Sequence, residues 1–125
     1  MRLTQVTPFV PCTSLEKQVA FYRDVLGFEV GFLIEGIYAF LKRDDTAVRL
    51  VKVGDDVDLH HPERQNSFYI DVQDIDALWA KLQQRLAELP EDRVRAPFNQ
   101  DYGQREFHVA DEDRTLIFFG EAVAI

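Results

Sequence analysis

The end of the chain shows the clearest alternation of polar and apolar residues. Residues 105–109 alternate with a period of two, residues 111–115 are polar and rich in aspartate, and residues 116–119 are continuously apolar. Alternation is typical of a strand with one buried face, and aspartate side chains hydrogen-bond the backbone of their own turn. The pattern therefore predicts a β-hairpin that closes a sheet.

Two upstream segments have the apolar spacing of amphipathic helices. The first stripe consists of Leu15, Val19, Tyr22 and Leu26, and the second of Ile75, Leu78, Trp79, Leu82 and Leu86. Thr13 and Glu16 have the spacing of a capping box before the first stripe, and Gly27 follows it as a C-terminal cap. Asp74 is the expected N-cap of the second helix.

The remaining apolar segments predict strands, and the same order of elements occurs twice. Strands are expected at residues 3–10, 28–34, 36–43 and 47–53, and again at 67–72, 93–96, 105–109 and 116–119. A polar linker, residues 54–66, separates the two sets. A shift of 60 positions takes Leu15 to Ile75, and a shift of 69 takes Val48 to Ile117. The spacing therefore predicts two similar halves.

This order predicts an α+β fold made of two βαβββ modules. We expect one domain over residues 1–125, with module one at about 1–53, the linker at 54–66 and module two at about 67–121. Two such modules bury their sheets when they pack together, or exchange strands with a second chain, as curved mixed sheets with helices outside. A concave sheet face with a few polar groups is a common kind of small-molecule site.

Charge and cysteine content restrict the partners and the location. The 125 residues include 22 acidic and 14 basic side chains, which gives a net charge of −8. This field repels a phosphate backbone, so we expect no nucleic-acid partner. No run approaches the roughly 18 apolar residues of a membrane span, and no signal-peptide pattern is present. The single cysteine, Cys12, cannot form an internal disulfide, which favours the reducing cytoplasm.

Three stretches resemble a known family. They are Phe-Tyr-Arg-Asp-Val-Leu-Gly-Phe at residues 21–28, the aspartate pair at 44–45 before an apolar strand, and Tyr-Gly-Gln-Arg-Glu-Phe at 102–107, followed by the hairpin at 111–121. In this combination the chain resembles the vicinal oxygen chelate superfamily, which includes glyoxalase I, extradiol dioxygenases and bleomycin resistance proteins. The resemblance covers nearly the whole chain. It implies a fold, and one fold hosts many chemistries.

The resemblance also allows a test for a metal site. Enzymes of the superfamily hold a divalent metal with His and Glu residues from the first and last strands of each module. The matching positions here are Thr7, Leu50 or Arg49, Ser67 and Phe118. These residues do not make a competent ligand set. We therefore expect no metal, no cofactor and no catalytic residue.

The chain is most similar to the bleomycin resistance branch, whose members sequester a cationic drug in clefts at a dimer interface. Aromatic side chains there stack on flat parts of the ligand, and acidic surface attracts its charge. The resemblance implies these ligand-binding residues: Tyr38, Phe40, Arg49, Tyr69, Tyr102 and Arg105. Pro8 matches a proline where the family's N-terminal strand crosses to the partner, which implies a strand-exchanged homodimer with Pro8 as its hinge.

The predicted function is non-catalytic binding and sequestration of a small aromatic or cationic compound, with a bleomycin-type antibiotic as one candidate. Arg49 would place a cation near a cationic ligand, so other flat or amphipathic molecules remain open. The alternative is a lyase or dioxygenase of the superfamily with a displaced metal site built from His108, Glu106 or Glu121. A third hypothesis is a structural or regulatory domain without a ligand, in which the tyrosines are ordinary half-buried sheet residues.

Overall fold

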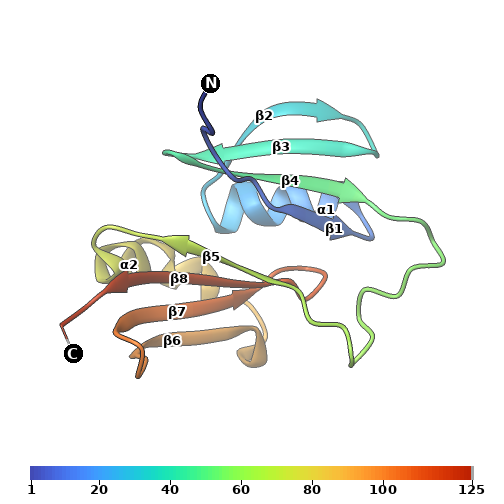
Figure 1. Ribbon diagram of the computed structural model, residues 1–125. Coiled ribbons are helices and arrows are strands. Elements are labelled where there is room, and N and C mark those ends of the chain that lie inside the picture. Colours follow the sequence, from blue (N-terminus) through green and yellow to red (C-terminus); the bar gives the residue numbers. More distant parts are fainter. Residues whose placement is uncertain (125) are drawn as a thin grey trace. The chain divides into compact units, whose positions relative to one another are not determined.

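The chain consists of two compact units, each with one sheet and one main helix. The computed structural model describes residues 1–124 and divides into units at Met1–His61 and Pro62–Ile125. Each unit has the order strand, helix, strand, strand, strand, and in each the helix covers one face of the sheet (Figure 1). The predicted α+β class with two βαβββ units is confirmed.

The first unit is a four-stranded sheet with the strand order β1-β4-β3-β2. Its elements are β1 (Phe9–Cys12), α1 (Leu15–Ala20), the π-helical turn η1 (Phe21–Val25), β2 (Glu29–Ile34), β3 (Tyr38–Arg43) and β4 (Thr46–Lys52). Strand β1 runs parallel to β4, and the other pairs are antiparallel. The four residues of the predicted stripe are all buried beneath the helical segment, as expected.

The second unit repeats this topology with the order β5-β8-β7-β6. Its elements are β5 (Ser67–Asp71), α2 (Ile75–Leu86), the 3₁₀ turn η2 (Glu91–Arg93), β6 (Val94–Asn99), β7 (Gln104–Ala110) and β8 (Leu116–Ala122). The predicted Asp74 cap is confirmed, since its side chain accepts a hydrogen bond from the Ala77 N–H at 3.3 Å. The core packs Phe107 against Phe119 at 4.8 Å and Trp79 at 5.1 Å between ring centroids.

Strand register confirms the internal repeat. Phe9 pairs with Arg49 across the two parallel strands of the first sheet, and Tyr69 pairs with Phe118 in the second. These two pairs are related by the shifts of 60 and 69 positions that the sequence predicted. The parallel pair β1–β4 of the first sheet therefore has its counterpart in the pair β5–β8 of the second, and these strands can be compared residue by residue.

Two predicted boundaries at the start of the chain are wrong. The first strand begins at Phe9 instead of residue 3, and Leu3 and Val6 are 100% and 93% exposed. Pro8 stands directly before β1 because it has no backbone N–H to donate to the sheet. The helix cap is Ser14 instead of Thr13, with the Ser14 hydroxyl accepting from the Lys17 N–H at 3.3 Å.

The hairpin at the end of the chain forms as predicted. The turn between β7 and β8 is ordered by Asp111, whose Oδ1 accepts from the N–H groups of Asp113 at 2.9 Å and Thr115 at 3.0 Å. Arg114 takes up the left-handed conformation with φ of 67° that the tight turn requires. This turn fixes the pairing of β7 with β8, and thereby the positions of the side chains on both strands.

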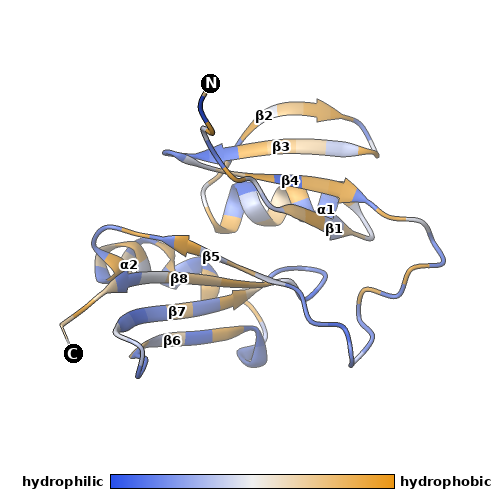
Figure 2. Cartoon of the chain, in the orientation of Figure 1, coloured by the Kyte–Doolittle hydropathy of each residue, from blue (hydrophilic) through white to orange (hydrophobic). Residues whose placement is uncertain are grey.

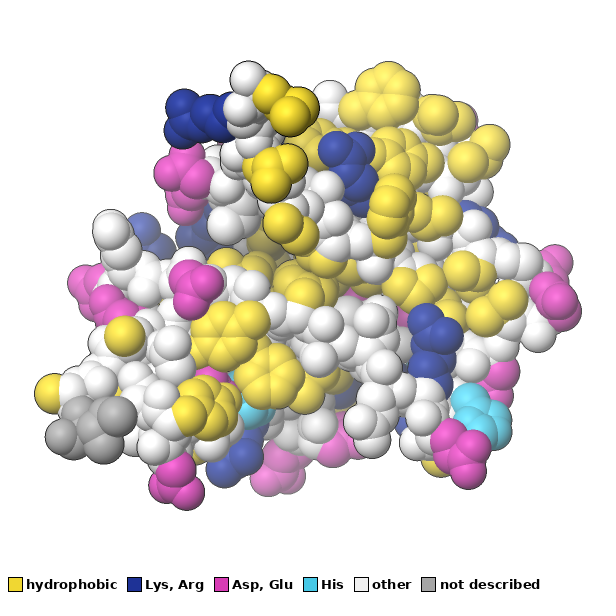
Figure 3. Space-filling model, viewed as in Figure 1, with side chains coloured by type: hydrophobic (Ala, Val, Ile, Leu, Met, Phe, Trp, Pro, Cys, Tyr) yellow, Lys and Arg dark blue, Asp and Glu magenta, His cyan; other side chains and the backbone are white. Residues whose placement is uncertain are grey.

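The sheet face of the first unit that is not covered by α1 carries exposed apolar side chains. Strand β2 is exposed along its whole length, and its residues are mostly apolar (Figure 2). Apolar side chains gather over β2 and β3 in the space-filling view (Figure 3). They include Phe32 and Ile34, which pair with Phe40 and Tyr38 and are 55% and 44% exposed. No helix among residues 1–124 is long and apolar enough to cross a membrane.

Candidate functional site

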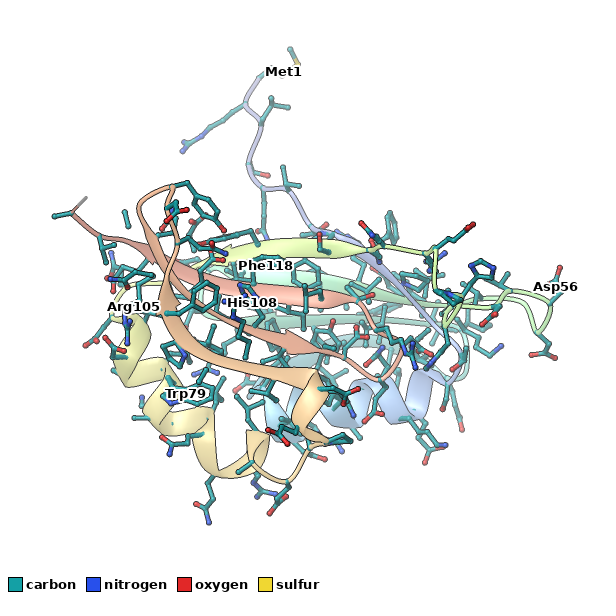
Figure 4. All side chains as sticks on the ribbon, turned by 90° about the horizontal axis from the view of Figure 1, so that it is seen from below. Met1, Asp56, Trp79, Arg105, His108 and Phe118 are labelled. Carbon is teal, nitrogen blue, oxygen red and sulfur yellow. The ribbon has the colours of Figure 1, made fainter. Side chains whose placement is uncertain are left out.

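The candidate site lies on the face of the second sheet that α2 does not cover. The period of two along β7 places Glu106 and His108 on this face and directs Arg105 and Phe107 to the side of the helix. Glu106 is directly opposite Gly120, and His108 is opposite Phe118. Figure 4 shows His108 and Phe118 side by side, whereas Arg105 lies beside α2.

The carboxylate of Glu106 is the centre of a hydrogen-bond network. Its Oε1 accepts from Gln100 Nε2 at 2.9 Å and from the Tyr102 hydroxyl at 2.7 Å, and it lies 2.8 Å from His108 Nε2. Its Oε2 accepts from the Tyr69 hydroxyl at 2.8 Å and also from Tyr102 at 2.8 Å. Glu106 is fully buried, so these donors replace the water that an exposed carboxylate would bind.

The network shifts the pKa values of Glu106, Tyr69 and Tyr102. Burial alone would raise the pKa of Glu106, but the hydrogen bonds from His108, Gln100 and the two tyrosines outweigh it and lower that pKa. Burial and the hydrogen bond to the carboxylate raise the pKa of the Tyr69 and Tyr102 phenols above the ordinary value. The site therefore keeps a buried negative charge that accepts hydrogen bonds from Gln100 and from two un-ionised tyrosine hydroxyls.

Aromatic rings surround this carboxylate. We call the following residues the aromatic face: Tyr69, Phe98, Tyr102, His108 and Phe118. Phe118 stacks on Tyr69 with centroids 5.9 Å apart and lies 4.1 Å from His108. Phe98 meets His108 edge to face at 5.2 Å. Tyr69 and Tyr102 are 37% and 59% exposed, so parts of both rings remain accessible although their hydroxyls are fixed by Glu106.

Gly120 provides the space in which the Tyr69 ring lies. A Cβ atom at position 120 would stand 1.8 Å from the Tyr69 hydroxyl oxygen and 2.6 Å from its Cζ. Both distances are far below van der Waals contact, so any larger residue would displace the ring. The absence of a side chain at this position therefore allows the hydrogen bond between Tyr69 and Glu106.

The corresponding face of the first sheet carries a positive charge. Arg49 Nε donates to the Thr7 hydroxyl at 2.7 Å, and its Nη1 donates to the Tyr38 hydroxyl at 2.5 Å. The guanidinium carbon lies 4.9 Å from the centre of the Phe40 ring, at cation–π distance. The predicted residues Tyr38, Phe40 and Arg49 are thus brought together in the first unit, as Tyr69 and Tyr102 are in the second.

Arg105 is separate from both groups. Its guanidinium forms an ion pair with Asp76 of α2 at 3.1 Å and donates to Asn99 Oδ1 at 3.1 Å. It therefore points away from the aromatic face that its neighbour Glu106 occupies. The structure places Arg105 as a contact between strand and helix, and its expected role in ligand binding stays a prediction.

The positions that the resemblance assigns to metal ligands do not fit a metal. The sequence left the ligand position on the last strand of the first module open between Leu50 and Arg49. Leu50 is fully buried among the core strands, so Arg49 is the residue at that position. The Thr7 hydroxyl accepts a hydrogen bond from Arg49, and Phe118 is packed between rings. A guanidinium and a phenyl ring offer no ligand atom to a divalent cation. We therefore derive no chemistry through a metal at these positions.

The displaced metal site considered for an enzyme does not form among residues 1–124. Glu121 instead caps α2, since its carboxylate accepts from the N–H groups of Asp74 at 2.8 Å and Ile75 at 3.1 Å. These backbone donors lower the pKa of Glu121. No group of three or more His, Cys, Asp and Glu side chains in the described chain is arranged to hold an ion. Glu106 and His108 lie 2.8 Å apart, and Glu106 also accepts from Gln100, Tyr69 and Tyr102.

The repeated βαβββ units and their shared register define a glyoxalase-like protein. The sequence matches the Glyoxalase/Bleomycin resistance protein/Dioxygenase superfamily over residues 2–119, and the chain belongs to this superfamily. No curated protein matches the sequence significantly.

Solved structures with the same fold include proteins of different function. A bleomycin-binding protein from Streptomyces verticillus, complexed with copper(II)-bleomycin, is 20% identical with a TM-score of 0.79, covering 100% of this chain and 99% of that chain. An antibiotic-binding protein from a Streptomyces species is 24% identical with a TM-score of 0.69, and 98% of each chain is covered. A lactoylglutathione lyase from Agrobacterium tumefaciens is 20% identical with a TM-score of 0.70, covering 96% and 95%. At these identities the likeness establishes the fold alone.

Proposed function

We propose that this protein binds and sequesters a small aromatic compound without changing it chemically. The proposal rests above all on the aromatic face, where two tyrosine rings are fixed by a buried carboxylate and still present accessible surface. A ring held in one orientation loses little conformational freedom when a flat ligand stacks on it, so more of the stacking energy appears as affinity. The acidic cytoplasmic protein that the sequence predicts would carry out this role in the reducing compartment.

A bleomycin-type antibiotic is the ligand to test first. Two proteins of the same fold are described as binding bleomycin or another antibiotic, which makes this chemical class the reasonable starting point. The tyrosines also attract positive charge, because each ring carries a hydroxyl hydrogen-bonded to a carboxylate and a negative π face. This feature supports a ligand with flat or cationic parts.

Calorimetric titration with metal-free and copper-loaded bleomycin tests the proposal. We expect saturable binding that Tyr69→Ala and Tyr102→Ala each weaken by about 10-fold, because a stacked aromatic contact contributes about 1–3 kcal/mol. Trp79→Phe, at a ring on the helix side of the sheet, is the matched control and should bind like the unmodified protein. Equal affinity in all variants would show that the ligand binds elsewhere, and an absence of heat would remove bleomycin as the ligand.

We also propose that the protein is a homodimer in which the N-terminal segment pairs with the partner chain. Leu3 and Val6 are exposed and apolar, and residues 1–8 form no strand in their own unit. Exchange of such a segment is a low-cost route to a dimer, and Pro8 stands where the segment leaves the sheet. Exposed apolar residues on β2 add surface that a partner would bury.

Sedimentation of the full-length protein tests the dimer. Replacing Leu3 and Val6 together by Asp should convert a dimer at micromolar concentration into a monomer, because two charges would have to be buried in the interface. Val57→Asp, in the exposed linker, is the control for an added charge and should leave the dimer intact. A monomer in the unmodified protein at the same concentration would overturn the proposal.

A further inference from the structure

The uncovered face of the first sheet differs from that of the second in the sign of its charge. Phe9, Arg49 and Phe40 are neighbours across β1, β4 and β3, and Phe32 is opposite Phe40 on β2. Tyr38 lies in the next row. Arg49 is therefore a half-buried cation in a row of aromatic rings, at the position whose counterpart in the second unit is Phe118.

The guanidinium is fixed in position but not neutralised. Its partners Thr7, Tyr38 and Phe40 are all uncharged. The ion pairs of this unit form elsewhere, and none of them includes Arg49 among the described residues. The second terminal nitrogen, Nη2, makes no hydrogen bond within the described part of the unit. An uncompensated charge beside apolar surface is costly, and an anion removes that cost.

Long-range electrostatics do not explain this arrangement. The protein has a net charge of −8, so its average field attracts cations and repels anions. Within residues 1–124 the other half-buried cations each pair with a carboxylate, whereas Arg49 does not; these are Arg43, Lys52, Arg93 and Arg105. Between aromatic rings the effective dielectric is lower than in water, and the attraction of Arg49 for an anion is correspondingly stronger.

We propose that Arg49 selects aromatic ligands that carry a carboxylate or a similar planar anion. The planar guanidinium matches a carboxylate, and the neighbouring rings accommodate the flat part of the same molecule. The inference rests on the proposed binding of an aromatic compound, and it narrows the ligand from aromatic or cationic to an aromatic acid or a zwitterion. It assigns the first unit a recognition role distinct from the stacking surface of the second unit.

Three matched probes test this selectivity in the full-length protein: 2-naphthoate, 2-naphthamide and 2-naphthylmethylammonium. They share one ring system and differ in charge. We expect naphthoate to bind at least about 10-fold more tightly than naphthamide, a difference of about 1.4 kcal/mol. We expect the ammonium compound to bind no better than the amide. Calorimetry measures the affinities, and the ¹⁵N shift of the Arg49 Nε–H group shows directly whether the anion reaches it.

Arg49→Met should abolish the preference for naphthoate over naphthamide, because the methionine keeps the apolar stem without the charge. Arg49→Lys should retain part of the preference and controls for loss of folding. Arg85→Met removes the same charge from an exposed position on α2 and should have no effect. Equal binding of all three probes, or a preference that survives Arg49→Met, would overturn the inference but leave the aromatic-ligand proposal standing. Failure of all three probes and of bleomycin would overturn both.

Discussion

Glu106→Gln is expected to lower the free energy of unfolding by about 2–4 kcal/mol at neutral pH, because buried donors would lose a charged acceptor. The amide that replaces the carboxylate has one acceptor oxygen and an NH₂ group that cannot accept at all. Gln100 and His108 would then face an unsatisfied or repelling neighbour at 2.8–2.9 Å. Urea denaturation measures the change, and an unaltered m-value would show that the compactness of both states is preserved.

The same substitution should change how stability depends on pH. The fold lowers the pKa of Glu106, so its contribution is complete above the ordinary glutamate value of about 4.3 and is lost as the pH falls below it. The raised pKa of Tyr69 affects stability at alkaline pH. Its contribution is complete below the ordinary tyrosine value of about 10 and is lost as the pH rises above it. Glu106→Gln should therefore lose less stability than the unmodified protein between pH 7 and pH 3, since its side chain does not titrate.

Glu88→Gln is the control for the exchange of a carboxylate for an amide. Glu88 is exposed just after α2, and its side chain makes no hydrogen bond within residues 1–124. This variant should unfold at the same urea concentration as the unmodified protein. If Glu106→Gln behaved like this control at pH 7, the carboxylate could not be the acceptor for its neighbours. The aromatic rings would then be free to turn, and the proposed stacking surface would lose its rigidity.

The fold was predictable from the sequence because its signals are local and repeated. The period of the helix stripes, the Asp74 cap and the aspartate turn each depend on neighbouring residues, and each is confirmed. The failed boundary at residues 3–8 has a different cause. Leu3 and Val6 have the alternation of a strand, but a strand exists only where another strand supplies its hydrogen bonds, and a single sequence does not show that partner.

The site was predictable only in part. The alternation of residues 105–109 already places Glu106 and His108 on one face, which was a usable signal for their proximity. That Gln100 and both tyrosines converge on the same carboxylate depends on the path of the loop before β7 and on pairing between strands distant in sequence. The role of Gly120 could not be inferred, because the Tyr69 ring lies where its Cβ atom would stand, and the sequence does not show that these two residues are neighbours.

Gly120→Ala is expected to expel the Tyr69 ring and lower the free energy of unfolding by about 1–3 kcal/mol, the usual cost of overpacking. The methyl group would stand 1.8 Å from the Tyr69 hydroxyl and 2.6 Å from Cζ, so rotation of the hydroxyl alone cannot relieve the contact. The ring has to leave, because Tyr69 is 37% exposed and can turn toward solvent, whereas the β8 backbone is paired on both sides.

A double-mutant cycle separates this mechanism from a general effect on β8. In a Tyr69→Ala background the space at position 120 is empty, so Gly120→Ala should lower the free energy of unfolding only slightly. The effects of the two substitutions on that free energy should therefore be strongly non-additive. A spectroscopic titration of the tyrosines gives a second measurement. The pKa of the Tyr69 phenol is raised by burial and by Glu106, so after its expulsion by Gly120→Ala this pKa should return toward the ordinary value of about 10. Additive costs and an unchanged titration would mean that the ring never occupied the position beside Glu106, and the ligand surface would have to be sought on the first unit around Arg49.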